Sequence, residues 1–255
     1  MNVLKSFTLT ICLVACSWSW ARADIGGMTY GVVNTTGHIV GTEQNLPPMV
    51  ARAHYFSGQG FADEINTYYQ SGRLLTDQSA VAAAARRSIQ NWLAGHCPRR
   101  NMDCKAMVVF DIDETLLSNY DYYAKETPAF TFNQQNWNAF SARCGQTAIE
   151  PTVSLFHWLQ KRGVRLVLLS GRSTSIQQET AQCLTQRGMT GDYRLILKSA
   201  QDQDPTAATF KARVRRRLQA EGYTIVASLG DQVSDMAHGA ARKGFLLPNL
   251  MYFIP

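Results

Sequence analysis

Residues 107–117 read Met-Val-Val-Phe-Asp-Ile-Asp-Glu-Thr-Leu-Leu, and this stretch determines the expected fold. It begins as an apolar run that ends at Phe110, the pattern of a strand buried on both faces. Asp111 and Asp113 follow, and in extended backbone their side chains point the same way. Two such carboxylates raise each other's proton affinity, so we expect either a cation between them or separate chemical tasks. Mg²⁺ prefers carboxylate oxygens, and an aspartate can itself attack phosphorus.

Downstream, apolar runs with strand character alternate with helical patterns. The runs lie at 164–169, 193–197, 224–229 and 245–247, and the helical patterns at about 151–162, 174–187 and 205–221. This alternation predicts an α/β fold with a parallel sheet and helices on both faces. Polar residues follow three of the runs within a few positions, namely Ser170 with Gly171, Lys198, and Asp231 with Asp235. Because ligands bind beyond the carboxyl ends of strands in such sheets, we expect these residues to meet at one site.

Two helical patterns precede the opening stretch, at 60–70 and 76–93. In the second, Val81, Ala85 and Ile89 share one face, as in a helix that packs on a core. The sequence therefore predicts an N-terminal helical extension within residues 24–105 that packs on the sheet or contributes to a lid.

Residues 110–119, Phe-Asp-Ile-Asp-Glu-Thr-Leu-Leu-Ser-Asn, resemble the first motif (DxDxT) of the haloacid-dehalogenase-like (HAD) phosphohydrolases. More narrowly, they are similar to the secreted acid phosphatase branch, which holds bacterial class B and class C enzymes and plant vegetative storage proteins. The later strand-end residues, Ser170-Gly171-Arg172, Lys198 and Asp231-x-x-x-Asp235, resemble the remaining HAD motifs in order and spacing. The resemblance implies a HAD-like Rossmannoid core at 106–255, with an insertion at about 119–149.

The resemblance also implies roles for the four acidic residues. Asp111 would be the nucleophile that forms a phospho-aspartate, and Asp113 the general acid and base. Mg²⁺ would be held by Asp111, the main-chain carbonyl of Asp113, and Asp231, with Asp235 as a ligand or a support for one.

The phosphoryl oxygens would be bound by the Ser170 hydroxyl, the Gly171 amide and the Lys198 ammonium. In the resembled family the region after the first motif contributes to the substrate entrance. The resemblance therefore implies that at least one aromatic side chain of the insertion stacks on a leaving group such as a nucleoside. The aromatic residues expected there are Tyr120, Tyr122, Tyr123 and Trp137. Alternatively, they only pack the insertion against the core.

The first 23 residues have the layout of a secretory signal peptide. An early base, Lys5, precedes an apolar run from Phe7 to Trp20, and Ala21-Arg22-Ala23 gives a cleavage site. A lipid anchor at Cys16 is the alternative, because Leu13-Val14-Ala15-Cys16 resembles a lipobox. Both interpretations predict an exported protein that is periplasmic or secreted, or an outer-membrane lipoprotein. No later segment predicts a membrane span.

Four cysteines remain outside this leader, and in an exported chain an even number indicates two disulfides. They allow three connectivities. Cys97 with Cys104 would close a short loop before the first core strand, which leaves Cys144 with Cys183.

The chain carries a formal net charge of +6 over 255 residues. Without the leader, 23 basic residues face 19 acidic ones, a modest excess that favours anionic substrates and does not indicate nucleic acid. The densest basic run is expected to be a solvated helix face beside the apolar positions Phe210, Val214 and Leu218. That run consists of Lys211, Arg213, Arg215, Arg216 and Arg217.

Taken together, the resemblance implies an exported, Mg²⁺-dependent acid phosphatase. It would hydrolyse small-molecule phosphomonoesters, among them nucleoside monophosphates. A storage or surface-binding protein on a phosphatase fold is one alternative, and a phosphotransferase that uses an alcohol in place of water is another. The sequence makes no prediction of oligomeric state.

Overall fold

The structure is a computed structural model that describes residues 24–25, 28–30, 58–97, 104–127 and 130–254. The expected leader at 1–23, with Cys16, lies outside these residues. Within them, no helix is both long and apolar enough to cross a bilayer.

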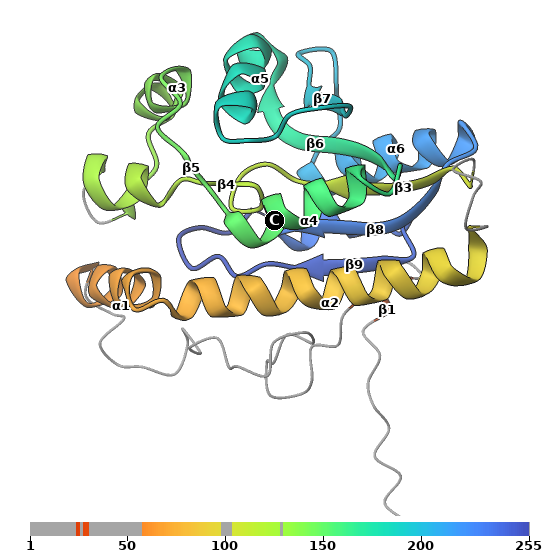
Figure 1. Ribbon diagram of the computed structural model, residues 1–255. Helices are drawn as coiled ribbons and strands as arrows, with labels where there is room; N and C mark the ends of the chain where they lie inside the picture. Colours follow the sequence, from red (N-terminus) through yellow and green to blue (C-terminus); the bar gives the residue numbers. More distant parts are fainter. Residues whose placement is uncertain (1–23, 26–27, 31–57, 98–103, 128–129, 255) are drawn as a thin grey trace, which may run out of the picture.

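A seven-stranded sheet forms the centre of the molecule, with strand order β1-β2-β9-β8-β3-β6-β7 (Figure 1). The last six strands in this order pair in parallel, and β1 pairs antiparallel with β2. The expected parallel α/β fold is therefore confirmed, and β1 and β2 extend it at one edge. The strands are β1 Asp24–Ile25, β2 Met28–Tyr30, β3 Ala106–Phe110, β6 Arg165–Ser173, β7 Arg194–Lys198, β8 Thr224–Gly230 and β9 Lys243–Leu246.

Helices cover both faces of the sheet because β3 buries side chains on both. Val108 and Phe110 belong to one apolar cluster with residues of α2, α4 and α5, while Met107 and Val109 belong to another with α6. The predicted face of α2, Val81 with Ala85 and Ile89, lies in the first cluster. The helices are α1 Gly58–Gln70, α2 Arg73–His96, α3 Gln134–Ala142, α4 Glu150–Gln160, α5 Gln177–Gln186 and α6 Ala207–Ala220.

The segment between β3 and α4 forms a separate small layer (Figure 1). It contains a two-stranded ribbon of β4 Leu117–Ser118 and β5 Thr147–Ala148, a π-helical turn at Tyr122–Glu126, and α3. Its aromatic residues form a third apolar cluster with residues of α1 and of the C-terminal segment. Residues from three distant parts of the sequence thus pack together beside the carboxyl end of the sheet.

Two disulfides join Cys97 to Cys104 and Cys144 to Cys183. This is the pairing in which the first two cysteines close a short loop. The second disulfide joins the end of α3 to α5, so it fastens the inserted layer to the core.

The expectation of a solvated basic face on α6 is wrong for two of its residues. Phe210, Val214 and Leu218 are buried as predicted, but Lys211 is only 5% exposed and Arg215 is fully buried. Arg215 donates to the main-chain carbonyls of Asp235 (2.7 Å) and Gly239 (3.2 Å). These carbonyls belong to the loop after β8, which covers this side of the helix and compensates the buried charge.

Candidate active site

The end of β3 presents Asp111 and Asp113 at the carboxyl edge of the sheet. The Asp111 amide donates to the Leu229 carbonyl of β8 (2.8 Å), which extends the strand pairing up to the acidic residue. Glu114 then adopts a left-handed conformation (φ 49°), and its amide donates to the Leu117 carbonyl (2.8 Å). This tight turn leads the chain away from the sheet directly after the two carboxylates.

The end of β8 adds two more carboxylates. Oxygen atoms of Asp111, Asp231 and Asp235 all lie within 4.8 Å of one another, and the three side chains are buried. Gly230 permits this arrangement, because a Cβ at that position would lie 2.0 Å from a carboxylate oxygen of Asp235. The close approach requires a residue without a side chain.

Helix α6 supplies a buried cation to the cluster. Lys211 Nζ donates to Asp111 Oδ1 (2.8 Å) and also to Asp235 Oδ1. Burial alone would lower the pKa of Lys211, but these two carboxylates raise it, so the ammonium remains charged. Three carboxylates and one ammonium leave a formal charge of −2.

The remaining negative charge fits a divalent cation. Burial raises the pKa of Asp111 well above its usual value, Lys211 lowers it, and Asp235 and Asp231 raise it further. Burial and the neighbouring Asp235 likewise raise the pKa of Asp231. A hard divalent ion binds such oxygen donors and would relieve their mutual repulsion. The residues present therefore suit a metal of this kind.

Asp113 has a different environment from the other three carboxylates. Arg172 Nε donates to Asp113 Oδ2 (2.9 Å) and the Arg172 NH2 group donates to Oδ1 (2.7 Å), while Asn119 Nδ2 also donates to Oδ1 (2.8 Å). Burial alone would raise the pKa of Asp113, but the guanidinium and the amide hold it below the usual range. Two carboxylates two residues apart thus have opposite pKa shifts, because Asp113 has a guanidinium partner and Asp111 has two carboxylate neighbours.

A cavity of about 770 Å³ opens over these groups. Asp111, Asp113 and Asp231 lie on its wall, and so do the expected phosphate-binding residues Ser170, Gly171 and Lys198. The Ser170 hydroxyl accepts a hydrogen bond from the Arg172 amide (3.2 Å). Lys198 Nζ donates to the Asp204 carbonyl (3.4 Å), whereas Lys211 contacts the carboxylates.

The family of the chain follows from a comparison with known proteins. The profile of the HAD superfamily, subfamily IIIB (acid phosphatase), matches residues 41–255, which is most of the sequence. The chain belongs to this family. The resemblance noted in the first motif is therefore confirmed.

Curated relatives of this acid phosphatase family include enzymes and storage proteins. Acid phosphatase 1 from Solanum lycopersicum is 32% identical over 154 residues, which are 60% of this chain and 60% of that protein. Vegetative storage protein 1 from Arabidopsis thaliana is 30% identical over 153 residues, 58% of this chain and 55% of that protein. The chain thus matches little more than half the length of these relatives.

The fold has a counterpart among solved structures. The class C acid phosphatase from Bacillus anthracis superposes with a TM-score of 0.60 and 19% identity, over 76% of this chain and 86% of that one. At this identity the likeness concerns the fold alone.

Among the aromatic residues of the insertion, the structure separates two pairs. Tyr123 and Trp137 line the cavity. Tyr120 instead stacks on Tyr69 of α1, with ring centroids 4.5 Å apart, and the hydroxyl of the buried Tyr122 donates to the Asn133 carbonyl (2.8 Å). The second pair therefore packs the insertion against neighbouring segments.

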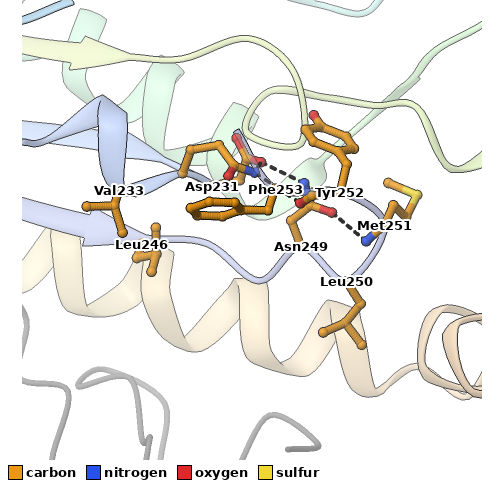
Figure 2. Close-up of a pocket in the computed structure, with 9 residues that line it drawn as sticks. Asp231, Val233, Leu246, Asn249, Leu250, Met251, Tyr252 and Phe253 are labelled. Atoms are coloured by element: carbon orange, nitrogen blue, oxygen red, sulfur yellow. Dashed lines mark hydrogen bonds between the residues drawn. The ribbon is translucent and has the colours of Figure 1, made fainter. Parts of the chain in front are cut away.

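The C-terminal segment contributes a hydrogen bond to Asp231, a contact that the sequence did not predict. Asn249 Nδ2 (2.7 Å) and Gln232 Nε2 (2.5 Å) both donate to Asp231 Oδ2. Figure 2 shows Asn249 between Asp231 and Met251. The main-chain amide of Met251 donates to Asn249 Oδ1 (2.8 Å). These amides fix the orientation of one oxygen of a carboxylate in the acidic cluster.

Lys211 and Arg172 were also missed as members of the site, and each left a signal in the sequence. Lys211 directly follows Phe210 and Arg215 directly follows Val214, so both basic residues flank the apolar stripe of α6 and can share its burial. Arg172 directly follows the expected phosphate-binding pair. Because the expected site contains four acidic residues, a basic residue such as Arg172 at the end of a neighbouring strand is a suitable counter-ion.

Proposed function

We propose that this member of the acid phosphatase family is a Mg²⁺-dependent phosphomonoesterase that works through a phospho-aspartate on Asp111. One observation carries the proposal: three buried carboxylates and a buried lysine converge under a cavity at the carboxyl edge of the sheet. A storage protein has no need to bury this much charge, because burying ionised groups is costly.

In this proposal the substrate's phosphoryl group enters the cavity above Asp111. Asp111 attacks phosphorus, the bond to the leaving oxygen breaks, and the alcohol departs. Asp113 donates a proton to that oxygen and then accepts one from the water that hydrolyses the intermediate. The bidentate contact with Arg172 and the bond from Asn119 orient the Asp113 carboxyl group, and because they favour its ionised form they support the step in which it accepts a proton from water.

Asp111, Asp231 and Asp235, together with the Asp113 main-chain carbonyl, would hold Mg²⁺. When bound, the ion would neutralise charge on the phosphoryl oxygens and so assist attack by a carboxylate. We assign the balancing of the carboxylates to Lys211, which contacts two of them. Ser170, Gly171 and Lys198 line the cavity and are proposed to bind phosphoryl oxygens.

The direct test compares the purified mature protein with Asp111→Asn, using phosphate release from phosphomonoesters at acid and neutral pH, with Mg²⁺ and with chelator. We expect metal-dependent release, and a loss of at least roughly a thousandfold in kcat for the variant. Asp192→Asn, an isosteric change at a strongly exposed carboxylate, is the matched control and should retain activity.

Product analysis with an added alcohol separates hydrolysis from phosphotransfer, because a transferase would form the new phosphomonoester. If folded, Mg²⁺-supplied protein releases no phosphate from any phosphomonoester, the storage or binding alternative becomes the better account.

We further propose that the protein is exported. The two disulfides support this, since such bonds persist in oxidising compartments. Mass spectrometry of the mature N-terminus would test cleavage after Ala23 against lipidation of Cys16.

A further inference from the structure

Large apolar side chains are exposed mainly around the mouth of the cavity. Among the described residues five such side chains are exposed, and three of them line the cavity: Phe132 (55%), Phe253 (72%) and Ile254 (44%). Trp137 and Ile176 line it as well. We call these five residues the apolar rim. Exposed apolar groups gathered at one place indicate a binding surface, whereas scattered ones need no explanation.

Besides the rim, the cavity has a charged part. The charged side chains on its wall are Asp111, Asp113, Arg172, Lys198, Lys211 and Asp231. Five of these six belong to the acidic cluster or to the Asp113 pair. A phosphomonoester has the same two parts, a charged phosphoryl group and an alcohol, so the rim is positioned for the alcohol.

Gln232 holds the C-terminal part of the rim in place. Its Oε1 accepts a hydrogen bond from the Ile254 amide (3.0 Å), and its Nε2 lies 3.4 Å from the Tyr252 carbonyl. The side chain thus contacts the main chain on both sides of Phe253. The same Nε2 donates to Asp231 Oδ2, so one residue connects the acidic cluster to the rim.

The C-terminal segment lines two neighbouring cavities. A second cavity, of about 420 Å³, lies against it and is shown in Figure 2. Asp231, Gln232, Tyr252 and Phe253 line both cavities. The position of this segment depends on the hydrogen bonds of Gln232 and Asn249.

The rim also lies next to the proposed general acid. The Arg172 guanidinium carbon lies 5.2 Å from the centre of the Trp137 ring, and the same guanidinium binds Asp113. A leaving oxygen close enough to Asp113 to receive its proton therefore places the attached alcohol near Trp137.

We propose that Phe253 and Ile254, positioned by Gln232, determine the specificity of the site and select phosphomonoesters of aromatic or apolar alcohols. This inference rests on the proposed phosphomonoesterase activity and adds the class of leaving group. Burial of a phenyl group against the rim contributes to binding in proportion to the apolar area removed from water.

The test uses two esters with chemically similar leaving groups, 2-phenylethyl phosphate and ethyl phosphate. Both release a primary alcohol, so the ratio of their kcat/KM values reports binding of the phenyl group and not leaving-group reactivity. Wild type should prefer the phenyl ester by at least roughly tenfold. Phe253→Ala and Ile254→Ala should each reduce that ratio severalfold, chiefly through KM for the phenyl ester.

Two further variants sharpen the test. Leu75→Ala removes an exposed apolar side chain of α2 that does not line the cavity, and should keep the wild-type ratio. Gln232→Ala should reduce the ratio as Phe253→Ala does, because the main chain on both sides of Phe253 loses its contacts with the Gln232 side chain. Circular dichroism confirms that each variant is folded.

Equal kcat/KM values for the two esters in wild type would overturn the inference while leaving the proposed function standing. A ratio for Phe253→Ala and Ile254→Ala that matches that of Leu75→Ala would do the same. Failure of wild type to hydrolyse either ester, or any other phosphomonoester, would overturn both.

Discussion

Lys211 is the residue that most changes the view of the site obtained from the sequence. It comes from the middle of a helix and not from a strand end, yet its ammonium group lies between Asp111 and Asp235. Lys198, at the end of β7, was the lysine expected at the site, and it lines the cavity without an ion pair to the carboxylates among the described residues. The two lysines therefore allow a direct comparison.

We predict that Lys211→Met lowers kcat/KM by roughly a hundredfold or more, because it removes a preorganised cation from the reacting centre. Lys198→Met should lower kcat/KM less than Lys211→Met does, because among the described residues Lys198 makes no ion pair with the carboxylates. Lys211→Arg separates charge from shape, since it keeps the cation in a bulkier form. Steady-state kinetics at saturating Mg²⁺ measures all three, and an equal loss in the two Met variants would contradict the assignment.

The individual carboxylates of the site could be predicted from the sequence, whereas the ion pairs that their counter-ions make could not. Asp111 and Asp113 follow an apolar run directly, and the two-residue spacing is a local property of the chain. Lys211 is a hundred positions from Asp111, and the burial of its flank of α6 depends on the loop after β8. The place of Lys211 beside Phe210 indicates that it can be buried, but it does not show which carboxylates it contacts.

At the scale of elements, helices α1 and α2 are joined by a buried polar contact. The Tyr68 hydroxyl donates to Asp77 Oδ2 (2.6 Å), and Asp77 is fully buried. Its Oδ1 has no hydrogen-bond partner among the described residues. Burial raises the pKa of Asp77, although the Tyr68 hydrogen bond opposes the rise.

This shift predicts a pH dependence of stability. The folded protein holds the Asp77 proton more tightly than the unfolded chain, so stability from this group is present at low pH and lost as pH rises through the folded pKa. Asp77→Asn removes the ionisation, so its stability should not fall in the same way. The free energy of unfolding of Asp77→Asn minus that of wild type should therefore increase as pH rises from about 4 to 7. Urea unfolding measures it, with Asp192→Asn as control; a constant difference would refute the prediction.

The disulfide between α3 and α5 should contribute more to stability than the one before β3. It links residues 39 apart in sequence, whereas Cys97 and Cys104 are 7 apart, and longer closed loops restrict the unfolded chain more. We expect Cys144→Ser/Cys183→Ser to lose about 4 kcal/mol and Cys97→Ser/Cys104→Ser about 2.5 kcal/mol. Denaturant unfolding of the two double variants would reveal a reversed order if the prediction were wrong.

The succession of elements was largely predictable, and the inserted layer was not. The parallel strands β3, β6, β7, β8 and β9 match the expected apolar runs because buried parallel strands have a distinctive composition. Tyr120 and Tyr122 look equivalent to Tyr123 in the sequence. Their separation into packing and cavity positions depends on contacts with α1 and α3, which tertiary structure alone supplies.

At the scale of the whole molecule, metal binding at the acidic cluster would affect global stability. Its members directly follow β3 and lie in the loop after β8, so a bound ion would connect two neighbouring strands of the sheet. We predict that Mg²⁺ raises the Tm of chelator-treated protein, because a ligand bound to the native state alone adds about 2.7 kcal/mol at a hundred times its Kd.

Asp231→Asn should abolish most of this shift, while Asp192→Asn should keep it. Differential scanning calorimetry at constant ionic strength measures the effect without relying on catalysis. A shift of the same size in Asp231→Asn would show that Mg²⁺ acts elsewhere on the protein.

The position of Ile254 at the cavity mouth has a practical consequence for handling the protein. A flexible peptide inserted directly after this residue would begin beside the cavity, and at such a high effective concentration it is expected to compete with a substrate for that cavity. Such a variant is expected to show a raised apparent KM that reflects the inserted peptide. Tests of the proposed activity should therefore use protein without an added segment after Ile254.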